Sequence, residues 1–474
     1  MKKKYARYTN KYMTKGKVLL LMAVMALSLL VLILIRGGIP SHYSYIPLLP
    51  FTSILVFVIT RAKVGNQQMD VATALIFGMT FMRYCLMPLL MVYGDFNTVM
   101  KHHIEVNAPH AILLMMYEEI VVYFAFVLSS MRNKTGTVQI QKPRFGGGAL
   151  FLLWFLLLYV TTFLVFRPQQ MDNYMTIFSL GKEEFTQADR LETFEVGSVM
   201  RIFSTLFSFF FNILRIVLPV YILGWMMKKR ASADMQVFFV LLFVFFQFLF
   251  ISATFAESII SALIVILSIG KSSPKVKKKM MRIAPVFVIG IIVLYFSVRY
   301  MVSQTLGGGH YDGDTFYAYL SSLTNAYLTG IDNVAASFNL KGEDLNGIWE
   351  HFKASMQITI PFNTTIFGKA GESLPTYYNE INNEIGQIPS TLGNCYYYLG
   401  PVFAPLFSGL FCYYAVKLNA IASRTSYYWH YIAYTFLSVV CTLALGMYNE
   451  VIALGWFGSW GLPLLISAKI MDKK

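Results

Sequence analysis

Apolar segments of about 20 residues recur along this chain of 474 residues. Such a segment crosses roughly 30 Å of hydrocarbon as an α-helix, which satisfies its own backbone N–H and C=O groups where no water is present. Only 13% of the residues are charged, whereas soluble domains average about 25%. A membrane barrel would instead require short strands of alternating polarity. The sequence therefore predicts an all-α polytopic membrane protein.

Twelve transmembrane helices are expected. The first precedes Arg36-Gly37-Gly38-Ile39-Pro40 and lacks a small-residue cleavage site, so we interpret it as a retained span rather than a signal peptide. The apolar tract 235–270 is too long for one span, and we divide it near Glu257. The spans cover approximately 18–35, 46–60, 70–93, 109–131, 147–166, 199–227, 235–253, 257–270, 283–300, 396–416, 430–448 and 451–467.

Basic residues indicate the orientation of these spans. The chain has 39 Lys and Arg residues and a net charge of +15, and most of the bases fall in short segments between alternate spans. Short cytoplasmic loops of membrane proteins carry such an excess of Lys and Arg. We therefore expect both termini in the cytoplasm and no nucleic acid as a partner.

Three regions follow from this topology. Residues 1–300 contain the first nine helices, with an extracytoplasmic loop at 167–198. Residues 301–395 are expected to form one large extracytoplasmic loop, because this long segment is too polar for a lipid core. Residues 396–474 contain the last three helices.

Arginines within the spans are candidates for a binding site, because an ionisable residue inside a bilayer is costly and is usually functional. Arginine stays charged when desolvated and binds phosphate oxygens in a bidentate manner. We expect a cationic site that opens outward and holds an anionic substrate such as a lipid-linked pyrophosphate. The candidate residues are Arg83, Arg201, Arg215 and Arg299.

These arginines have a structural alternative. Arg83 or Arg215 would pair with Glu118 or Glu119 and tie helices together. Arg201 and Arg299 would extend to the membrane interface.

Catalytic groups are expected at the beginning of the large loop, in the run from Gly307 to Asp314. This run lacks the Lys-Ser/Thr of a phosphate-binding loop and the length of a calcium loop. It is either a flexible exit from a span or a source of acid–base groups. The candidate catalytic residues are His310, Asp312, Asp314 and Glu257, the last at the turn between the seventh and eighth spans. No cluster has metal-ligand spacing, so neither a metal nor a cofactor is expected.

Aromatic residues later in the loop are suited to sugars, which stack on rings and hydrogen-bond at their edges. The candidate sugar-binding residues are Tyr377, Tyr378 and Glu372. The alternative for such tyrosines is an aromatic belt at the membrane interface.

The second half of the chain resembles a known family. The pattern consists of a span that ends in Arg299, a loop with Tyr327-Leu328-Thr329-Gly330, Asn382-Asn383 and Pro389-Ser390, and re-entry through Tyr396-Tyr397-Tyr398-Leu399-Gly400-Pro401 into an apolar span with Gly409. It resembles the Wzy-type polymerases of O-antigen and capsule repeat units. Leu399 departs from the Asp or Phe that often precedes the glycine in that family.

The resemblance implies a glycosyltransferase of the bacterial cytoplasmic membrane that builds cell-envelope polysaccharide. It would transfer a growing glycan from undecaprenyl pyrophosphate to a new lipid-linked repeat unit, without a metal, at the outer face of the bilayer. A polysaccharide chain-length regulator is a candidate partner. The alternatives are a ligase that moves finished glycan to another acceptor and a flippase or exporter of lipid-linked oligosaccharide.

Overall fold

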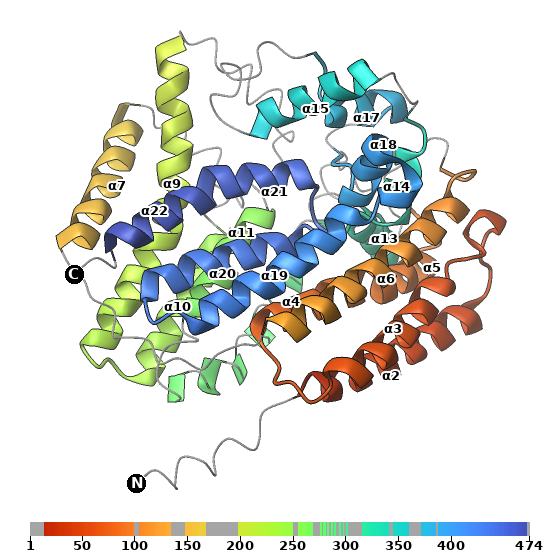
Figure 1. Cartoon of the computed structure of the whole chain (residues 1–474), viewed down its shortest axis with the longest axis horizontal. Helices are drawn as coiled ribbons and strands as arrows, with labels where there is room; N and C mark the ends of the chain where they lie inside the picture. The colour runs from red at the N-terminus through yellow and green to blue at the C-terminus, as the bar shows by residue number, and fades with distance from the viewer. Residues whose placement is uncertain are drawn as a thin grey trace, which may run out of the picture. The chain divides into compact units, whose positions relative to one another are not determined.

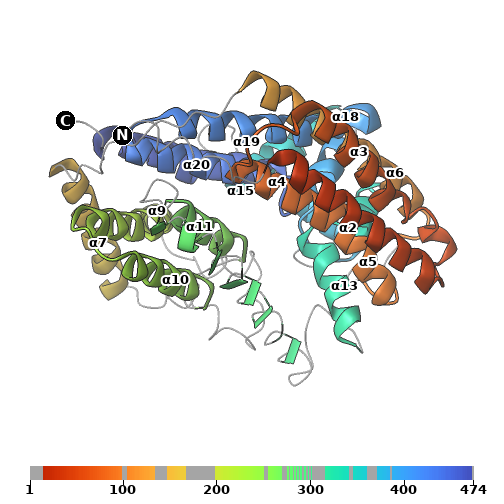
Figure 2. The same cartoon turned by 90° about the horizontal axis from the view of Figure 1, so that it is seen from below.

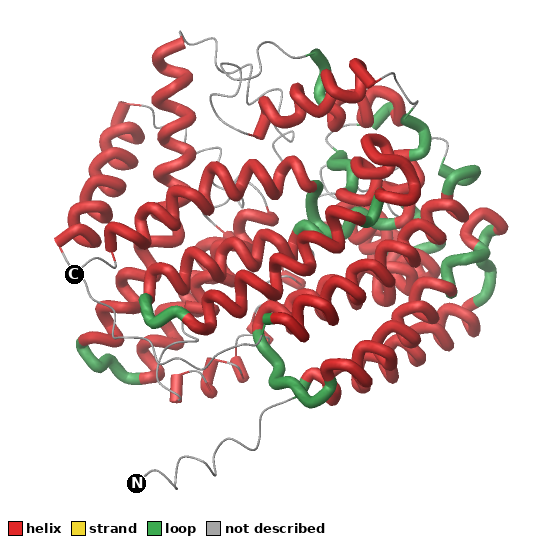
Figure 3. The backbone as a smooth tube through the Cα atoms, viewed as in Figure 1, coloured by secondary structure: helices red, strands yellow, loops and turns green. Residues whose placement is uncertain are grey.

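The computed structural model describes residues 14–98, 104–133, 147–166, 198–249, 255–268, short stretches between 275 and 301, and residues 315–340, 345–359, 371–384 and 387–471. Across these residues the chain is helical and forms no strand (Figure 3). The single isolated β-bridge in this part of the chain joins Thr14 to Gln68. The prediction of an all-α protein is confirmed.

Seven helical segments within the described residues are long and apolar enough to cross a membrane: Lys15–Arg36, Ser41–Val64, Val71–Tyr93, Ala108–Arg132, Phe210–Lys228, Leu406–Arg424 and Glu450–Met471. Shorter apolar helices cover Leu150–Phe166, Ala233–Phe248 and Glu257–Ser268. These helices agree with the expected membrane protein. The number of twelve spans and their orientation stay predictions, and much of the expected span 283–300 lies outside the described residues.

The chain folds into two compact units. The first contains Met1–Thr135, His310–Ala420 and Cys441–Ala453. The second contains Gly136–Gly309, Ile421–Val440 and Leu454–Lys474.

A helical hairpin begins the first unit. Helices α2 (Lys15–Arg36) and α3 (Leu48–Val64) lie side by side, and α6 (Ala108–Arg132) packs on α3 (Figures 1 and 2). Gly37 and Gly38 have φ angles of +60° and +67°, which glycine adopts without the strain that a Cβ causes. The chain can therefore reverse between α2 and the short η2 (Ser41–Tyr43) that precedes α3.

The expected span 70–93 is one helical segment with a local change of pitch. It consists of α4 (Val71–Phe81), a π-helical turn η3 (Met82–Leu86) and α5 (Met87–Tyr93). The Asp70 side chain caps α4 by accepting from the backbone N–H of Thr73 at 3.0 Å, because the first N–H groups of a helix have no partner within it.

Residues 315–340 fold against the ends of these helices. Helix α13 (Phe316–Tyr327) packs on α5, as Figure 2 shows, and α14 (Ile331–Ser337) packs on α6. Two connections bond to these residues. Tyr43, before α3, donates to Asp332 at 2.5 Å, and between α5 and α6 Asn97 donates to Ser322 at 3.0 Å and Asn107 to Asn339 at 2.8 Å. Both connections, which the sequence assigns to one side of the membrane, thus contact the polar segment assigned to that side.

The polar segment continues through α15 (Leu345–Thr359) and α17 (Leu374–Asn382) into α18 (Thr391–Phe403) and α19 (Leu406–Arg424). The bounds of the span expected at 396–416 therefore shift in the structure, where the helix long and apolar enough to cross a membrane is α19, Leu406–Arg424. Gly400 at φ +74° and the following Pro401 interrupt α18, since proline has no N–H for the helical ladder.

The second unit contains α7 (Gly147–Phe166), α9 (Ser198–Lys228), α10 (Ala233–Leu249) and α11 (Phe255–Ser268). The tract 235–270 thus contains two helices, as predicted. Helix α9 contacts the other three, and the stacked rings of Phe163 and Phe207 lie 4.6 Å apart between α7 and α9.

The last helices are α20 (Tyr428–Leu443), α21 (Glu450–Trp456), a π-helical turn η6 (Phe457–Gly461) and α22 (Leu462–Met471). The end of α20 and the beginning of α21 belong to the first unit, and the remainder belongs to the second.

The close approach at Gly330 provides a test of this packing. A Cβ there would lie 2.2 Å from both Asn325 Oδ1 and Met87 Sδ, so Gly330→Ala should destabilise the detergent-solubilised protein by about 1–3 kcal/mol through overpacking. Thermal unfolding measures the change. Gly78→Ala is the matched control, because a Cβ at Gly78 meets nothing within 4 Å. Equal unfolding temperatures for the two variants would contradict the packing described.

Candidate functional site

The candidate site is centred on Arg83, which the π-helical turn η3 carries. Such turns add a residue to an α-helix and occur often at functional sites. Pro88 follows within the first turn of α5 and cannot donate a backbone hydrogen bond. The Arg83 side chain is only 2% exposed, so its charge must be compensated by the protein.

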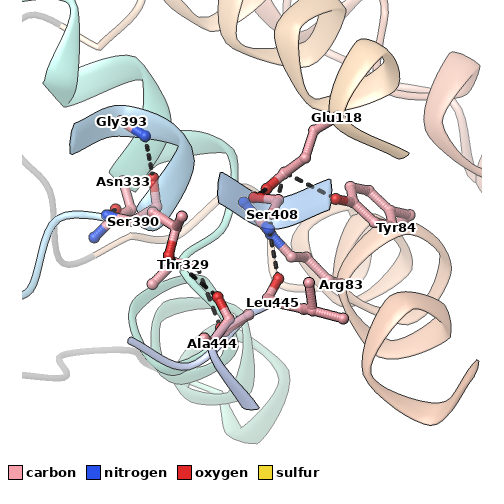
Figure 4. A network of polar contacts seen from close by, with 12 residues as sticks. Arg83, Tyr84, Glu118, Thr329, Asn333, Ser390, Gly393, Ser408, Ala444 and Leu445 are labelled. Carbon is pink, nitrogen blue, oxygen red and sulfur yellow. Dashed lines mark hydrogen bonds and ion pairs between the residues drawn. The ribbon is translucent and has the colours of Figure 1, made fainter. Parts of the chain in front are cut away.

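Glu118 of α6 supplies that compensation. Arg83 Nη1 lies 2.9 Å from Glu118 Oε2, and the same oxygen accepts from the Tyr84 hydroxyl at 2.8 Å. The other oxygen, Oε1, accepts from Ser408 Oγ at 2.6 Å (Figure 4). Both oxygens of this buried carboxylate are therefore satisfied, as a buried ion pair requires. Of the sequence alternatives for Arg83, the structure contains the pair with Glu118.

Arg83 also binds a break between two helices. Helix α20 ends at Leu443 and α21 begins at Glu450, and Arg83 Nη1 donates to the Leu445 carbonyl in between at 2.7 Å. The last carbonyls of a helix have no partner within it and carry partial negative charge. A guanidinium is therefore a favourable partner for them.

The polar segment also donates hydrogen bonds to the break between α20 and α21. Thr391 Oγ1 donates to the carbonyl of Ala444 at 3.2 Å, and Thr329 Oγ1 donates to that of Gly446 at 3.3 Å. The consecutive carbonyls 444, 445 and 446 are thus bound by two threonines of the polar segment and by Arg83 of the membrane helix. Figure 4 shows Arg83 and Thr329 beside this turn, with Ala444 and Leu445 labelled.

Asn333 positions the threonines. Its Oδ1 accepts from Ser390 N at 2.8 Å and its Nδ2 donates to Ile388 O at 2.8 Å, which fixes α14 to the start of α18. Ser390 then caps α18 by accepting from Gly393 N at 2.8 Å (Figure 4). The Pro389-Ser390 pair of the family resemblance therefore lies at the helix start that carries Thr391.

The guanidinium of Arg83 keeps two nitrogens without a hydrogen-bond partner among the described residues. These are Nε and Nη2, and both are buried. They lie on one edge of the guanidinium plane, the edge that presents two parallel N–H groups to a carboxylate or phosphate. A buried donor without an acceptor costs about 1–3 kcal/mol, so binding of an anionic oxygen pair at this edge would recover that cost.

Arg215 has a different environment in the second unit. Its Nε and Nη2 both donate to Gln247 Oε1, at 3.1 and 2.9 Å, so the corresponding edge is occupied. Its Nη1 lies 3.3 Å from Glu257 Oε2 and 3.2 Å from Asn212 Oδ1. The structure thus pairs Arg215 with Glu257 rather than with Glu118 or Glu119, because α9, α10 and α11 bring these residues together. Arg215, an expected phosphate-binding residue, and Glu257, an expected base, therefore form one ion pair.

Several predicted residues lie outside the described part of the chain. They are Arg299, His310, Asp312 and Asp314. Arg201 belongs to α9, and its side chain is outside the description. Their roles stay predictions.

The predicted sugar-binding residues lie around α17. Tyr377 is half-buried and stacks on His351 with ring centroids 4.7 Å apart. Glu372 is also half-buried, and its carbonyl lies 2.8 Å from His351 Nδ1. Tyr378 instead is fully buried and donates its hydroxyl to Asn333 O at 3.0 Å. Tyr378 therefore packs in the core, and sugar binding by the partly exposed Tyr377 and Glu372 stays a prediction.

Sequence reasoning missed Asp332, a buried acid of α14. It accepts from Tyr43 and from Asn325. Burial raises the pKa of this carboxyl above its ordinary value, although these hydrogen bonds oppose the shift. The residue lies two positions after Gly330 in sequence, but only the fold brings Tyr43 to it from 289 residues away.

Comparisons of the chain with models of protein families, with curated proteins and with solved structures found no match.

Arg83 and Glu118 allow a test of the buried pair. Arg83→Ala should lower the free energy of unfolding by about 3–5 kcal/mol, because it leaves the Glu118 carboxylate buried without a cation. The double variant Arg83→Met with Glu118→Gln should recover part of this loss. The exposed pair of Arg36 and Asp95 provides the control, and Arg36→Ala should cost at most about 1 kcal/mol. Thermal unfolding compares them, and equal losses at Arg83 and Arg36 would contradict a buried pair.

Asp332 predicts a pH dependence of stability. Its folded pKa is raised, so the folded state holds the proton more tightly than the unfolded state. Protonated Asp332 therefore stabilises the folded state. This stabilisation is fully present below the ordinary aspartate pKa of about 4 and is lost as the pH rises through the folded pKa. Asp332→Asn should therefore gain stability relative to the wild type as the pH increases from about 4 toward neutrality. Unfolding temperatures measured across this range test it, and parallel profiles for the two proteins would refute the assignment.

Proposed function

We propose that this protein polymerises lipid-linked oligosaccharide repeat units at the outer face of a bacterial cytoplasmic membrane. The reaction would transfer a growing glycan from undecaprenyl pyrophosphate to a hydroxyl of the next lipid-linked unit, producing O-antigen, capsule or a related polysaccharide. The membrane helices would hold the lipid pyrophosphate, and the polar segment would bind the sugars.

The observation that carries this proposal is the open edge of Arg83. Nε and Nη2 are buried, lack partners among the described residues and form a bidentate edge. A pyrophosphate presents pairs of oxygens that match such an edge, and arginine keeps its charge in a desolvated site. During transfer, negative charge develops on the departing pyrophosphate, and a fixed guanidinium would stabilise it without reorganisation.

The connection between Arg83 and the polar segment supports the same function. Thr329 and Thr391 bond to the carbonyls on either side of the one that Arg83 binds. A segment that selects a sugar would thereby be coupled to the residue that holds the phosphate. Tyr377, half-buried beside His351, offers an aromatic ring of the kind on which sugars stack.

Incubation of the reconstituted protein with lipid-linked repeat units distinguishes the candidate functions. A ladder of longer lipid-linked glycans supports polymerisation. Transfer of glycan to a different acceptor supports a ligase, and movement across the bilayer without new glycosidic bonds supports a flippase. Loss of the ladder in Arg215→Ala and Arg299→Ala, at normal membrane levels, would support a role of these arginines in the reaction.

Arg83→Lys is the most specific variant for this assay. Lysine keeps the positive charge but cannot present two parallel donors, so elongation should slow by about 100-fold, the usual effect of losing one donor to a developing oxyanion. Arg61→Lys, at an exposed position of α3, should elongate at the wild-type rate. Unchanged elongation by a folded Arg83→Lys protein would remove Arg83 from the phosphate site.

A further inference from the structure

Glu450 is a second buried carboxylate beside the helix break, and its environment differs from that of Glu118. Glu450 is only 3% exposed. Oε1 accepts from Asn394 Nδ2 at 3.2 Å, whereas Oε2 is buried and has no hydrogen-bond partner among the described residues. No ion pair joins it to a base within that part of the chain. Glu118 has a donor on each oxygen, so Glu450 keeps an acceptor position that Glu118 lacks.

Two asparagines next to Glu450 also have unused polar atoms. Asn394 and Asn449 are fully buried, and Asn394 Oδ1 and Asn449 Nδ2 lack hydrogen-bond partners among the described residues. The amide of Asn394 must direct its nitrogen toward the carboxylate, so its oxygen is the free atom. Buried polar groups are nearly always bonded, and three such atoms on adjoining residues indicate a missing polar ligand.

The free atoms define the chemistry of that ligand. Two are acceptors, Glu450 Oε2 and Asn394 Oδ1, and one is a donor, Asn449 Nδ2. A cation would satisfy the oxygens but not the amide nitrogen, and an anion would be repelled by the carboxylate. Neighbouring hydroxyls both donate and accept, as those of a sugar ring do. The set therefore fits a polyhydroxylated ligand.

The site belongs to the same helix break as Arg83. Glu450 follows Leu445, the carbonyl of which Arg83 binds, by five residues of a single turn. The Cys395 thiol of α18 lies within electrostatic range of both Glu450 and Glu118, and burial together with these two carboxylates raises its pKa. Thr391 and Asn394, three residues apart on α18, bond to the Ala444 carbonyl and to Glu450, on either side of the carbonyl that Arg83 binds.

The geometry points to Glu450 as the general base that activates the acceptor sugar, an inference that rests on the proposed function. The acceptor hydroxyl donates to Glu450 Oε2, while a neighbouring hydroxyl bonds to Asn394 and Asn449. As the acceptor oxygen forms its bond to the anomeric carbon, the bond from that carbon to the pyrophosphate oxygen breaks. The electron pair leaves with the lipid pyrophosphate, and the hydroxyl proton passes to Glu450 and then to water. Asn394 is a positioning residue, because it holds Oε1 and directs Oε2 to the hydroxyl.

Glu450→Gln tests the assignment in the full-length protein reconstituted with lipid-linked repeat units. The amide keeps the shape of the side chain but cannot take the proton, so kcat for elongation should fall by about 100-fold or more. The KM for the lipid-linked donor should stay within about twofold, because Glu450 acts on the acceptor. Glu105→Gln, an exposed position before α6, is the matched control and should retain the wild-type kcat.

The outcomes separate this inference from the function on which it rests. A wild-type ladder with an undiminished kcat in Glu450→Gln overturns the base and leaves the polymerase standing. A wild-type protein that forms no ladder overturns the polymerase and removes the acceptor on which the base would act. If Glu450→Gln does not fold, as judged by its unfolding temperature, Glu450→Asp replaces it. That variant draws the carboxylate back by one methylene and should lose about 10-fold in kcat with KM held, and an unchanged kcat overturns the assignment.

Discussion

The ion pair between Arg83 and Glu118 is the interaction on which the first unit depends. Two charges are buried between helices, where the cost of removing an ion from water is several kcal/mol. Tyr84 and Ser408 donate hydrogen bonds to the Glu118 carboxylate, and Arg83 Nη1 also donates to the Leu445 carbonyl. One pair thereby joins the π-helical turn η3, α6, α19 and the break after α20. Such a pair adds little net stability over an apolar contact of the same size, but its loss on one side leaves an uncompensated buried charge.

The helix break turns this structural pair into a candidate site. Irregular backbone is tolerated at membrane depth only where its polar groups are bonded or line a polar cavity. Here Arg83, Thr329 and Thr391 bond three consecutive carbonyls. Two of these donors come from the segment that is too polar for lipid, so the polar segment packs against the membrane helices rather than standing apart from them.

Glu118 and Glu450 illustrate how environment separates similar residues. Glu118 has a donor on both oxygens and holds its helices, whereas Glu450 keeps Oε2 free beside two asparagines with unused atoms. The arginines differ in the same way. Nε and Nη2 of Arg215 both donate to Gln247, whereas the same two nitrogens of Arg83 have no partner among the described residues. In each case the unused hydrogen-bonding capacity, rather than the residue type, marks the group that can meet a substrate.

The sequence by itself determined the helical membrane architecture, because the length of an apolar run and the need to bond every backbone group act locally. The expected spans 18–35 and 109–131 correspond closely to α2 and α6. It also identified Arg83 and named Glu118 and Glu119 as partners without choosing between them. Only the tertiary structure decided that Arg83 pairs with Glu118, that Arg215 pairs with Glu257, and that Glu450 lies beside Asn394. Those contacts join residues up to 56 positions apart, and the bond from Arg83 to the Leu445 carbonyl spans 362. No local pattern encodes which buried hydrogen bonds are made and which stay open.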